Sequence, residues 1–290
     1  MNAVILQVLA AVILFGGAWP ITKAALADAT PMWFAAGRAG LATIAAAVAL
    51  MLLRRLRLPD RRDWPSVIAI GVLQLGGFFA LVHAAVALVP AGRTAILSNV
   101  VTYWVIPLSV IFLGEHVSSR RWLSAGIGVA GAAVLAGPWA IDWSERTTLA
   151  GHLMLLAGGL SWSLAIIASR KWPPVTPMLI LLPWCFGVGT LVLGPLALWL
   201  EPGGGIGSTS WPFMIYIGII AAPIGTWCVI EIGRHLPGAI SSVVLLLVPA
   251  FGVLVSNLWL GEALGWDVIL GGGLIMASVV VAATDRGSTR

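Results

Sequence analysis

The chain has 290 residues, of which 60% are hydrophobic and only 9% are charged, with a formal net charge of +5 and a mean hydropathy of +1.02. About a quarter of the residues of a soluble domain are charged, so this composition excludes a soluble globular enzyme or binding module. It predicts an all-α integral membrane protein, because lipid offers backbone groups no hydrogen-bond partner outside a helix.

A helix needs about 20 apolar residues to cross the hydrocarbon core of a bilayer. Ala25-Leu26-Ala27 after the first apolar stretch imitates a signal-peptidase site, but residues 1–13 lack the basic segment of a signal peptide, and we keep this stretch as helix one. The sequence therefore predicts ten transmembrane helices, over residues 3–23, 32–53, 64–88, 91–113, 119–139, 149–169, 177–200, 211–233, 238–260 and 264–283.

A single offset of 147 residues superposes the second half of the chain on the first. Leu113-Gly114-Glu115 falls on Leu260-Gly261-Glu262, and the same offset pairs Pro90 with Pro237, Gly71 with Gly218, Gly40 with Gly187, Thr43 with Thr190, Gly126 with Gly273 and Lys23 with Arg170. The chain is thus predicted to be a tandem repeat of residues 1–143 and 144–290. Because each half holds five spans, the second half starts on the opposite side of the membrane, which predicts an inverted repeat and alternating access.

The positions of the basic residues predict the orientation. With a cytoplasmic N-terminus, the inner loops and the C-terminal tail hold twelve basic residues, and the outer loops and helix ends hold only Lys23, Arg93 and Arg146. Both termini are therefore expected in the cytoplasm, and the basic loop 54–62 is expected to meet anionic lipid headgroups rather than nucleic acid. Cys185 and Cys228 lie in separate spans with no spacing that indicates a metal, and we expect both to be buried apolar residues.

Several motifs carry a family resemblance: Leu-Gly-Glu at the end of helices four and nine, each followed by a Gly-rich helix, Pro237-Gly238 at the start of helix nine, and Ser161-Trp162-Ser163 in helix six. Over essentially the whole chain the sequence resembles the EamA family of the drug/metabolite transporter superfamily, and within it most resembles the YddG-type aromatic amino acid exporters. The resemblance implies ten helices, a location in the bacterial inner membrane, and a central cavity lined by helices one, three, four, six, eight and nine.

Two positions depart from the family pattern. Phe15-Gly16 stands where the family has Trp-Gly in helix one, and Thr102 stands where it has a proline in helix four. Pro249 in the second repeat keeps that proline, so the kink in helix four is expected at Pro107 instead.

The polar and aromatic residues on the helices that the resemblance assigns to the cavity are the candidates for substrate binding. In helix four, Asn99, Thr102 and Tyr103 share one face, which either binds substrate or makes hydrogen bonds between packed helices. His83 is either a packing residue or a proton carrier. The full set of substrate-binding candidates is Trp19, Gln74, Phe78, His83, Asn99, Tyr103, Trp162, Ser163, Trp227 and Ser241.

Charged residues and a proline at the helix ends are the candidates for gating. Pro20 bends helix one in mid-membrane. Lys23 and Glu262 should lie near the outer face, and Arg170 and Glu115 near the inner face, as two symmetry-related ion pairs that latch alternate gates or as simple helix-end charges.

Arg38 in helix two is left with three interpretations: it binds a substrate carboxylate, snorkels outward or pairs with a neighbouring residue.

These features predict a transporter that exports aromatic and other apolar amino acids as its small-molecule substrates. Helix one has no buried carboxylate, which disfavours proton-coupled cation efflux, although a multidrug, lipophilic-cation or other metabolite efflux transporter remains the alternative. An enzyme is not expected, because the four histidines are scattered and helix interiors lack aspartate. No cofactor or metal is expected, and the sequence indicates no oligomeric state beyond compatibility with a monomer.

Overall fold

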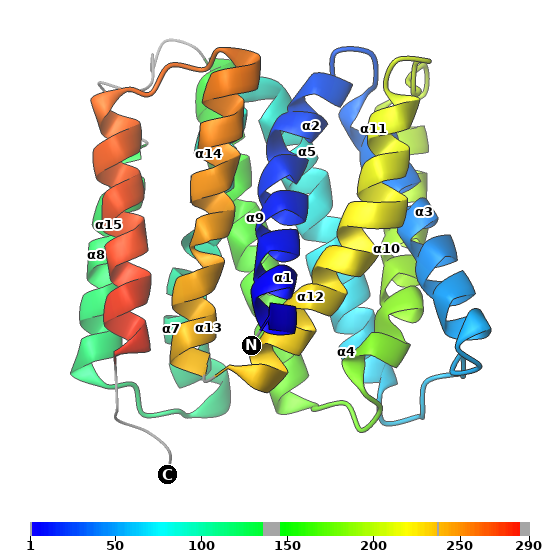
Figure 1. The fold of residues 1–290 in the computed structure, drawn as a ribbon, viewed down its shortest axis with the longest axis horizontal. Coiled ribbons are helices and arrows are strands. Elements are labelled where there is room, and N and C mark those ends of the chain that lie inside the picture. Colours follow the sequence, from blue (N-terminus) through cyan, green and yellow to red (C-terminus); the bar gives the residue numbers. More distant parts are fainter. Residues whose placement is uncertain (1, 136–145, 237, 285–290) are drawn as a thin grey trace.

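The computed structural model describes residues 2–135, 146–236 and 238–284, and their regular secondary structure is helical apart from one isolated bridge between Ala29 and Ile206. The helices stand side by side as one bundle (Figure 1). Eight helical runs in these ranges are long and apolar enough to cross a membrane: Ala3–Ala25, Pro31–Leu52, Trp64–Leu88, Arg146–Lys171, Met178–Leu200, Trp211–His235, Val243–Leu260 and Trp266–Ala283.

The first half of the chain holds α1 (Asn2–Ala11), η1 (Val12–Gly16), α2 (Gly17–Ala25), α3 (Pro31–Leu52), α4 (Trp64–Ala69), η2 (Ile70–Phe78), α5 (Phe79–Leu88), α6 (Ala91–Leu97), η3 (Ser98–Val100), α7 (Val101–Leu113) and α8 (Ser119–Leu135). The second half holds α9 (Arg146–Lys171), α10 (Met178–Leu200), α11 (Trp211–Ile215), η4 (Tyr216–Ala221), α12 (Ala222–His235), α13 (Gly238–Leu245), α14 (Leu247–Leu260) and α15 (Trp266–Ala283).

Three of the ten predicted spans differ from the structure. The span predicted over 238–260 is divided at Leu246 into α13 and α14. The span predicted over 91–113 is interrupted by η3, which leaves only the short apolar helix Tyr103–Leu113 beyond the break. The span predicted over 119–139 is α8, which has 17 residues in the described part, and residues 136–139 lie outside it. The described residues therefore hold eight long apolar helices and shorter ones, where ten transmembrane helices were predicted.

The inverted repeat is visible where α3 meets α10. Thr43 Oγ1 lies 3.4 Å from Thr190 Oγ1, and these residues are equivalent under the offset of 147. A Cβ atom on Gly40 would lie 3.6 Å from the Thr190 methyl group, and one on Gly187 would lie 3.7 Å from the Thr43 methyl group. Reciprocal contacts of this kind arise where a two-fold axis relates two copies of one surface, so α3 and α10 meet at the pseudo-two-fold axis of the bundle.

Three of the helical runs contain π-helical turns. η1 interrupts the first run, and η2 and η4 occupy equivalent places in the two repeats, since Ile70 corresponds to Ile217. A π-helical turn widens a helix and often marks a functional site. The residues around η2 are therefore candidates for a functional site.

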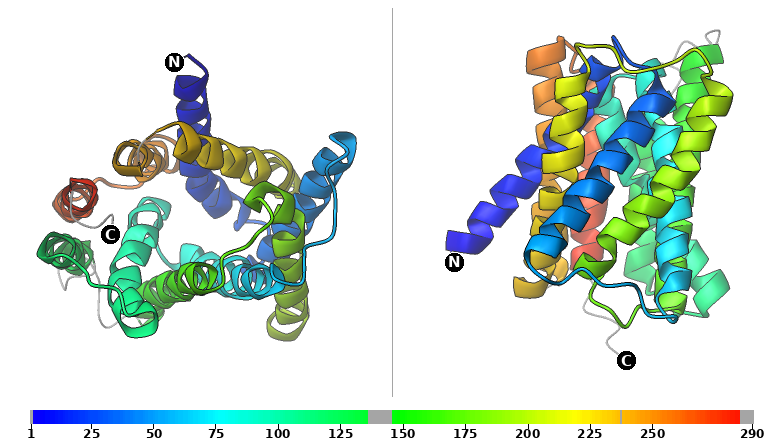
Figure 2. Two further views of the ribbon diagram at one scale, coloured as in Figure 1. Left: turned by 90° about the horizontal axis from the view of Figure 1, so that it is seen from below. Right: turned by 90° about the vertical axis from the view of Figure 1, so that its right-hand side faces the viewer.

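Seen along the helix axes, the bundle forms a ring, with α8 and α15 packed against each other beside α7 and α13 (Figure 2). α1 begins and α15 ends at the same end of the bundle, at the bottom of Figure 1. We call this end the terminal side, and the end at which α2 meets the loop to α3 the far side.

Candidate functional site

An aromatic cluster from three elements lies inside the bundle. Phe78, at the end of η2, is 2% exposed, and its ring meets that of Trp162 on α9 edge to face at a centroid distance of 4.6 Å. Phe79 follows at the start of α5, with its ring centroid 5.7 Å from that of Phe78. Two predicted candidates, Phe78 and Trp162, are thus in contact, and Phe79 joins them although the sequence reasoning missed it.

A basic pair adjoins this cluster. Arg38 Nη1 on α3 lies 3.2 Å from His83 Nε2 on α5, and the guanidinium carbon lies 4.3 Å from the centroid of the Phe79 ring. His83 Nδ1 lies 2.7 Å from the carbonyl oxygen of Phe79. Because a carbonyl oxygen only accepts, Nδ1 carries the proton and Nε2 accepts from Arg38. The i, i+4 spacing places Phe79 and His83 on one face of α5, but no sequence pattern indicates the contact of that face with Arg38 on α3.

Gln74 occupies the middle of η2. Its amide is partly exposed and makes no side-chain hydrogen bond to any residue that the structure describes. Ser161 on α9 donates to the carbonyl oxygen of Leu73 at 2.7 Å, which ties η2 to α9 at this level. Gln74 therefore places a free donor and acceptor near the middle of the helical run Trp64–Leu88, on the same π-helical segment as Phe78.

The break at η3 is braced from α9. Ser163 is buried, and its hydroxyl lies 2.8 Å from the carbonyl oxygen of Val101 and 2.7 Å from that of Gly159. Asn99, inside η3, donates to the carbonyl oxygen of Ala95 at 3.0 Å. Both predicted candidates thus satisfy backbone groups at a helix interruption in the described residues.

Three other predicted candidates make their contacts elsewhere, although Tyr103 belongs to the same hydrophobic core as Phe78. Tyr103 is buried against α15, where its hydroxyl lies 2.7 Å from Ser278 Oγ. Trp227 is 41% exposed and shares a face of its helical run with exposed Ile220 and Ile224. Ser241 is buried near the end of α12, with its hydroxyl 3.3 Å from the carbonyl oxygen of Leu236.

Trp19 and Pro20 lie in α2, next to α14. Gly252 on α14 allows close approach, since a Cβ atom there would lie 3.5 Å from the Trp19 ring and 3.1 Å from the carbonyl oxygen of Gly16. Trp19 also packs against the hydrophobic core that contains Phe78. Pro20 is buried inside α2, and this run remains helical through the proline.

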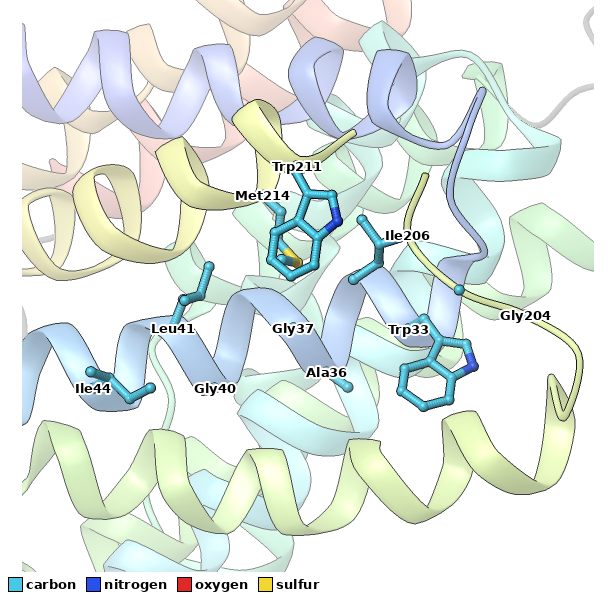
Figure 3. Close-up of a pocket in the computed structure, with 11 residues that line it drawn as sticks. Trp33, Ala36, Gly37, Gly40, Leu41, Ile44, Gly204, Ile206, Trp211 and Met214 are labelled. Atoms are coloured by element: carbon cyan, nitrogen blue, oxygen red, sulfur yellow. The ribbon is translucent and has the colours of Figure 1, made fainter. Parts of the chain in front are cut away.

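Two apolar pockets open between helices elsewhere. One, of about 560 Å³, lies between α3, α11 and the loop before α11, and exposed Ile44 and Trp211 are among its lining residues (Figure 3). The other, of about 650 Å³, lies between α7, α8 and α9 and is lined by Trp104 and His152. Trp104 Nε1 and His152 Nε2 are buried and have no hydrogen-bond partner among the described residues, so neither atom faces the open part of this second pocket.

On the far side, Lys23 binds the C-terminal end of α5. Its ammonium group donates to the carbonyl oxygens of Val86 at 2.6 Å, Ala87 at 3.2 Å and Val89 at 3.2 Å. The last carbonyl groups of a helix have no partner within the helix and carry a partial negative charge. Lys23 therefore caps α5 from a different transmembrane run.

Glu262 binds the start of the next helix. Its carboxylate accepts the backbone N–H of Ala91 at 2.6 Å and that of Gly92 at 2.8 Å, at the N-terminus of α6. A carboxylate is favoured there by the free N–H groups and the helix dipole. No ion pair joins Lys23 to Glu262 in the part of the chain that the structure describes; both side chains hold the corner between α5 and α6.

On the terminal side, the equivalent residues contact each other. Arg170 at the end of α9 forms an ion pair with Glu115, which follows α7. Gly114 and Gly261, which precede the two glutamates, have φ angles of 66° and 67°. This left-handed conformation suits glycine and ends a helix. The repeated Leu-Gly-Glu motif thus ends α7 and α14 alike and places the two glutamates at equivalent positions.

An inverted repeat of membrane-spanning helices, with interrupted helices and polar groups near the membrane centre, is the architecture of secondary transporters. Residues 2–137 and 149–284 each match the model of the EamA-like transporter family, and the two matches begin 147 residues apart, at residues 2 and 149. The chain belongs to this family. It is a multi-pass membrane protein and a transporter rather than an enzyme.

Relatives of similar length support this assignment. The transporter YvbV of Bacillus subtilis (strain 168) is 26% identical over 284 residues, which cover 94% of this chain and 89% of the relative. A probable terminal-alkyne amino-acid exporter of Streptantibioticus cattleyicolor is 25% identical, with coverage of 93% and 90%. A crystal structure 19% identical in sequence superposes with a TM-score of 0.66 over 97% of both chains and shares the fold.

Proposed function

We propose that the protein exports aromatic and other apolar amino acids by alternating access, through ten membrane crossings with both termini in the cytoplasm. The orientation is supported by charge. The arginine-rich loop between α3 and α4 lies on the terminal side, where α1 begins and α15 ends (Figure 1). Loops rich in arginine and lysine stay on the cytoplasmic side of a membrane, so the terminal side is assigned to the cytoplasm.

Alternating access is supported by unequal packing at the two ends of the bundle. On the far side, α6 packs along α14, and α5 packs on α2 and α3. The equivalent pairs on the terminal side are α7 with α13, and α12 with α9 and α10, and among the described residues these pairs do not pack to a comparable extent. We infer a conformation that is closed on the far side and open toward the terminal side.

The charged candidates suggest how the two gates alternate. At the closed end, Lys23 and Glu262 reach across to the helix ends at the α5–α6 corner. At the open end, Arg170 and Glu115 pair with each other instead. When the conformation inverts, Lys23 should pair with Glu262, while Arg170 caps the end of α12 and Glu115 binds the N-terminus of α13. Each gate would thus exchange an ion pair for two helix caps.

The substrate class is supported by one observation above all, the edge-to-face contact of Phe78 with Trp162, and Gln74 lies in the same π-helical segment as Phe78. Aromatic pairs accept a further aromatic ring in offset or edge-to-face contact, each worth about 0.5–1.5 kcal/mol beyond the area buried. The probable terminal-alkyne amino-acid exporter of Streptantibioticus cattleyicolor is a relative over nearly the whole length.

Counterflow into proteoliposomes tests this function. Vesicles loaded with unlabelled tryptophan should accumulate labelled tryptophan and phenylalanine saturably, with or without an imposed pH gradient. Tetraphenylphosphonium, a lipophilic cation, should neither accumulate nor compete. Accumulation of that cation alone, and only with a pH gradient, would refute amino acid export in favour of drug efflux.

A further inference from the structure

Arg38 is a cation within a membrane-spanning helix and has no acidic partner among the described residues. It lies in α3, about two turns from the N-terminal end of that helix. No carboxylate of the described residues forms an ion pair with it, and its polar contact is the neutral imidazole of His83. Charged groups at such depth are costly, and they face the protein interior, pair with an opposite charge or serve a function.

The surroundings of Arg38 are interior ones. Phe34, one turn earlier on the same face of α3, has its ring 6.0 Å from that of His83 and packs against Met214 and Ile217. Across from Arg38, a Cβ atom on Gly218 would lie 2.9 Å from the Arg38 carbonyl oxygen. This face of α3 therefore points toward α5 and η4, and the side chain is engaged there instead of snorkelling to the membrane surface.

The guanidinium group of Arg38 is held in place, but some of its N–H donors have no partner among the described residues. The carbonyl oxygen of Phe79 fixes the His83 ring, His83 Nε2 accepts from Nη1, and the Phe79 ring covers one face. A guanidinium has five N–H donors, so the edge formed by Nε and Nη2 is left. The buried polar atoms without a partner in the described residues are Gln7 Oε1, Trp104 Nε1 and His152 Nε2. Nε and Nη2 of Arg38 also have no partner among the described residues, but they are not among these buried atoms, so this edge of the guanidinium is accessible.

We propose that this edge of Arg38 binds the carboxylate of the transported molecule, with His83 as a positioning residue. A planar guanidinium binds a carboxylate through two parallel hydrogen bonds, and such a ligand would supply the missing negative charge. Phe79, Phe78 and Trp162 form a continuous run of ring contacts from this point. The partly exposed rings of Phe79 and Trp162 are the ones that an apolar side chain of the ligand would meet, because Phe78 is buried between other side chains. The inference rests on the proposed function and adds to it the group that selects amino acids over amines.

Three ligands with the same indole ring separate a carboxylate site from a structural role. Tryptophan has both charged groups, indole-3-propionate lacks the ammonium, and tryptamine lacks the carboxylate. Each is measured as a competitor of tryptophan counterflow and as a stabiliser of the purified protein against heat. Arg38→Gln should weaken the binding of tryptophan and of indole-3-propionate about tenfold or more, as expected for the loss of hydrogen bonds to a charged group. The affinity for tryptamine should change less than twofold.

Two further variants keep the test sharp. Arg38→Lys retains the charge without the planar edge. Its affinity for tryptophan and indole-3-propionate should therefore lie between that of the wild type and that of Arg38→Gln. Arg61→Gln removes an exposed loop arginine and should change none of the three ligands. If Arg38→Gln does not fold, the contrast between carboxylates and tryptamine in Arg38→Lys carries the test alone.

The outcomes distinguish this inference from the proposed function. An equal loss for all three ligands, or no loss for any, would overturn the role of Arg38 while tryptophan transport by the wild-type protein still stood. Stabilisation of the wild type by indole-3-propionate, dependent on Arg38, without any amino acid transport would refute the proposed function and support the site. A wild-type protein that neither carboxylate stabilises or inhibits would refute the carboxylate site.

Discussion

Glu262→Gln should open the far side of the bundle. The carboxylate accepts two backbone N–H groups of α6, at 2.6 and 2.8 Å. A hydrogen bond to a charged group contributes about 1.5–3 kcal/mol and a neutral one about 0.5–1.5 kcal/mol. The glutamine amide keeps one neutral acceptor and turns a donor toward the other N–H. In the open state the variant loses only the expected ion pair with Lys23, worth about 0–1 kcal/mol. The closed far side should therefore lose about 2 kcal/mol relative to the open one, which corresponds to a population change of about thirtyfold.

Ser256→Cys provides a near-isosteric reporter of this change. Ser256 on α14 is 0% exposed, and a Cβ atom on Gly92 of α6 would lie 3.6 Å from the Ser256 Cβ, so a thiol there is covered while the two helices are together. The native Cys185 and Cys228, both buried, are first replaced by alanine. In nanodiscs, a polar maleimide should label Ser256→Cys about thirtyfold faster in the Glu262→Gln background, provided that opening is fast compared with labelling.

A reporter that is exposed on the same side shows that the reagent itself is not the cause. Ser208→Cys lies in the exposed loop before α11 and should label equally fast in the wild-type and Glu262→Gln backgrounds. Equal labelling of Ser256→Cys in both backgrounds, with a normal Ser208→Cys control, would refute the helix-capping account of the gate.

Three further predictions concern the other gate, a buried hydrogen bond and the aromatic cluster. Glu115→Gln removes an exposed ion pair worth about 0–1 kcal/mol from the present conformation, but it removes a helix cap from the inverted conformation. The variant should therefore favour the present conformation and slow the labelling of Ser256→Cys. Faster labelling would contradict the exchange of an ion pair for helix caps. Tyr103→Phe removes the buried hydrogen bond to Ser278 and should cost about 1 kcal/mol in thermal unfolding, with an unchanged KM for tryptophan in counterflow; a raised KM would show that Tyr103 meets substrate. Trp162→Leu should raise that KM about twofold to tenfold with little effect on the KM of an aliphatic substrate, and equal effects on both would contradict aromatic recognition.

The repeat and its charged helix ends were predictable because residues that are 147 positions apart are often of the same type. Equivalent residues occupy equivalent places in the two repeats, as the contact of Thr43 with Thr190 and the left-handed Gly114 and Gly261 show. The family assignment confirms an all-α transporter of two repeats. Span limits were predictable within a few residues wherever a helix is unbroken, since the apolar stretch itself sets its length.

The faces of the helices were not predictable. In a soluble protein the polar face of a helix points to water, but in a membrane the lipid-facing and packed faces are both apolar. The spacing of Asn99 and Tyr103 predicted a shared face, but Asn99 lies within the 3-10 turn η3 and Tyr103 in α7 beyond it. Asn99 therefore bonds back to Ala95, and Tyr103 is buried against α15. Phe79 was not predicted as a site residue, because its contact with Arg38 on α3 depends on how the helices pack and not on any pattern in the sequence.

The repeats match at their gates and differ at their centre, and the two facts have one physical explanation. The offset that pairs Lys23 with Arg170 and Glu115 with Glu262 pairs Arg38 with Cys185 and His83 with Ile230. A carrier must hold two inverted conformations at similar free energy, which favours equivalent capping groups at both ends. An amino acid has one carboxylate and lies in the site in one direction, so a second arginine at position 185 would leave one guanidinium without an anion in every state. Symmetric gates around an asymmetric binding site are therefore what transport of such a substrate requires.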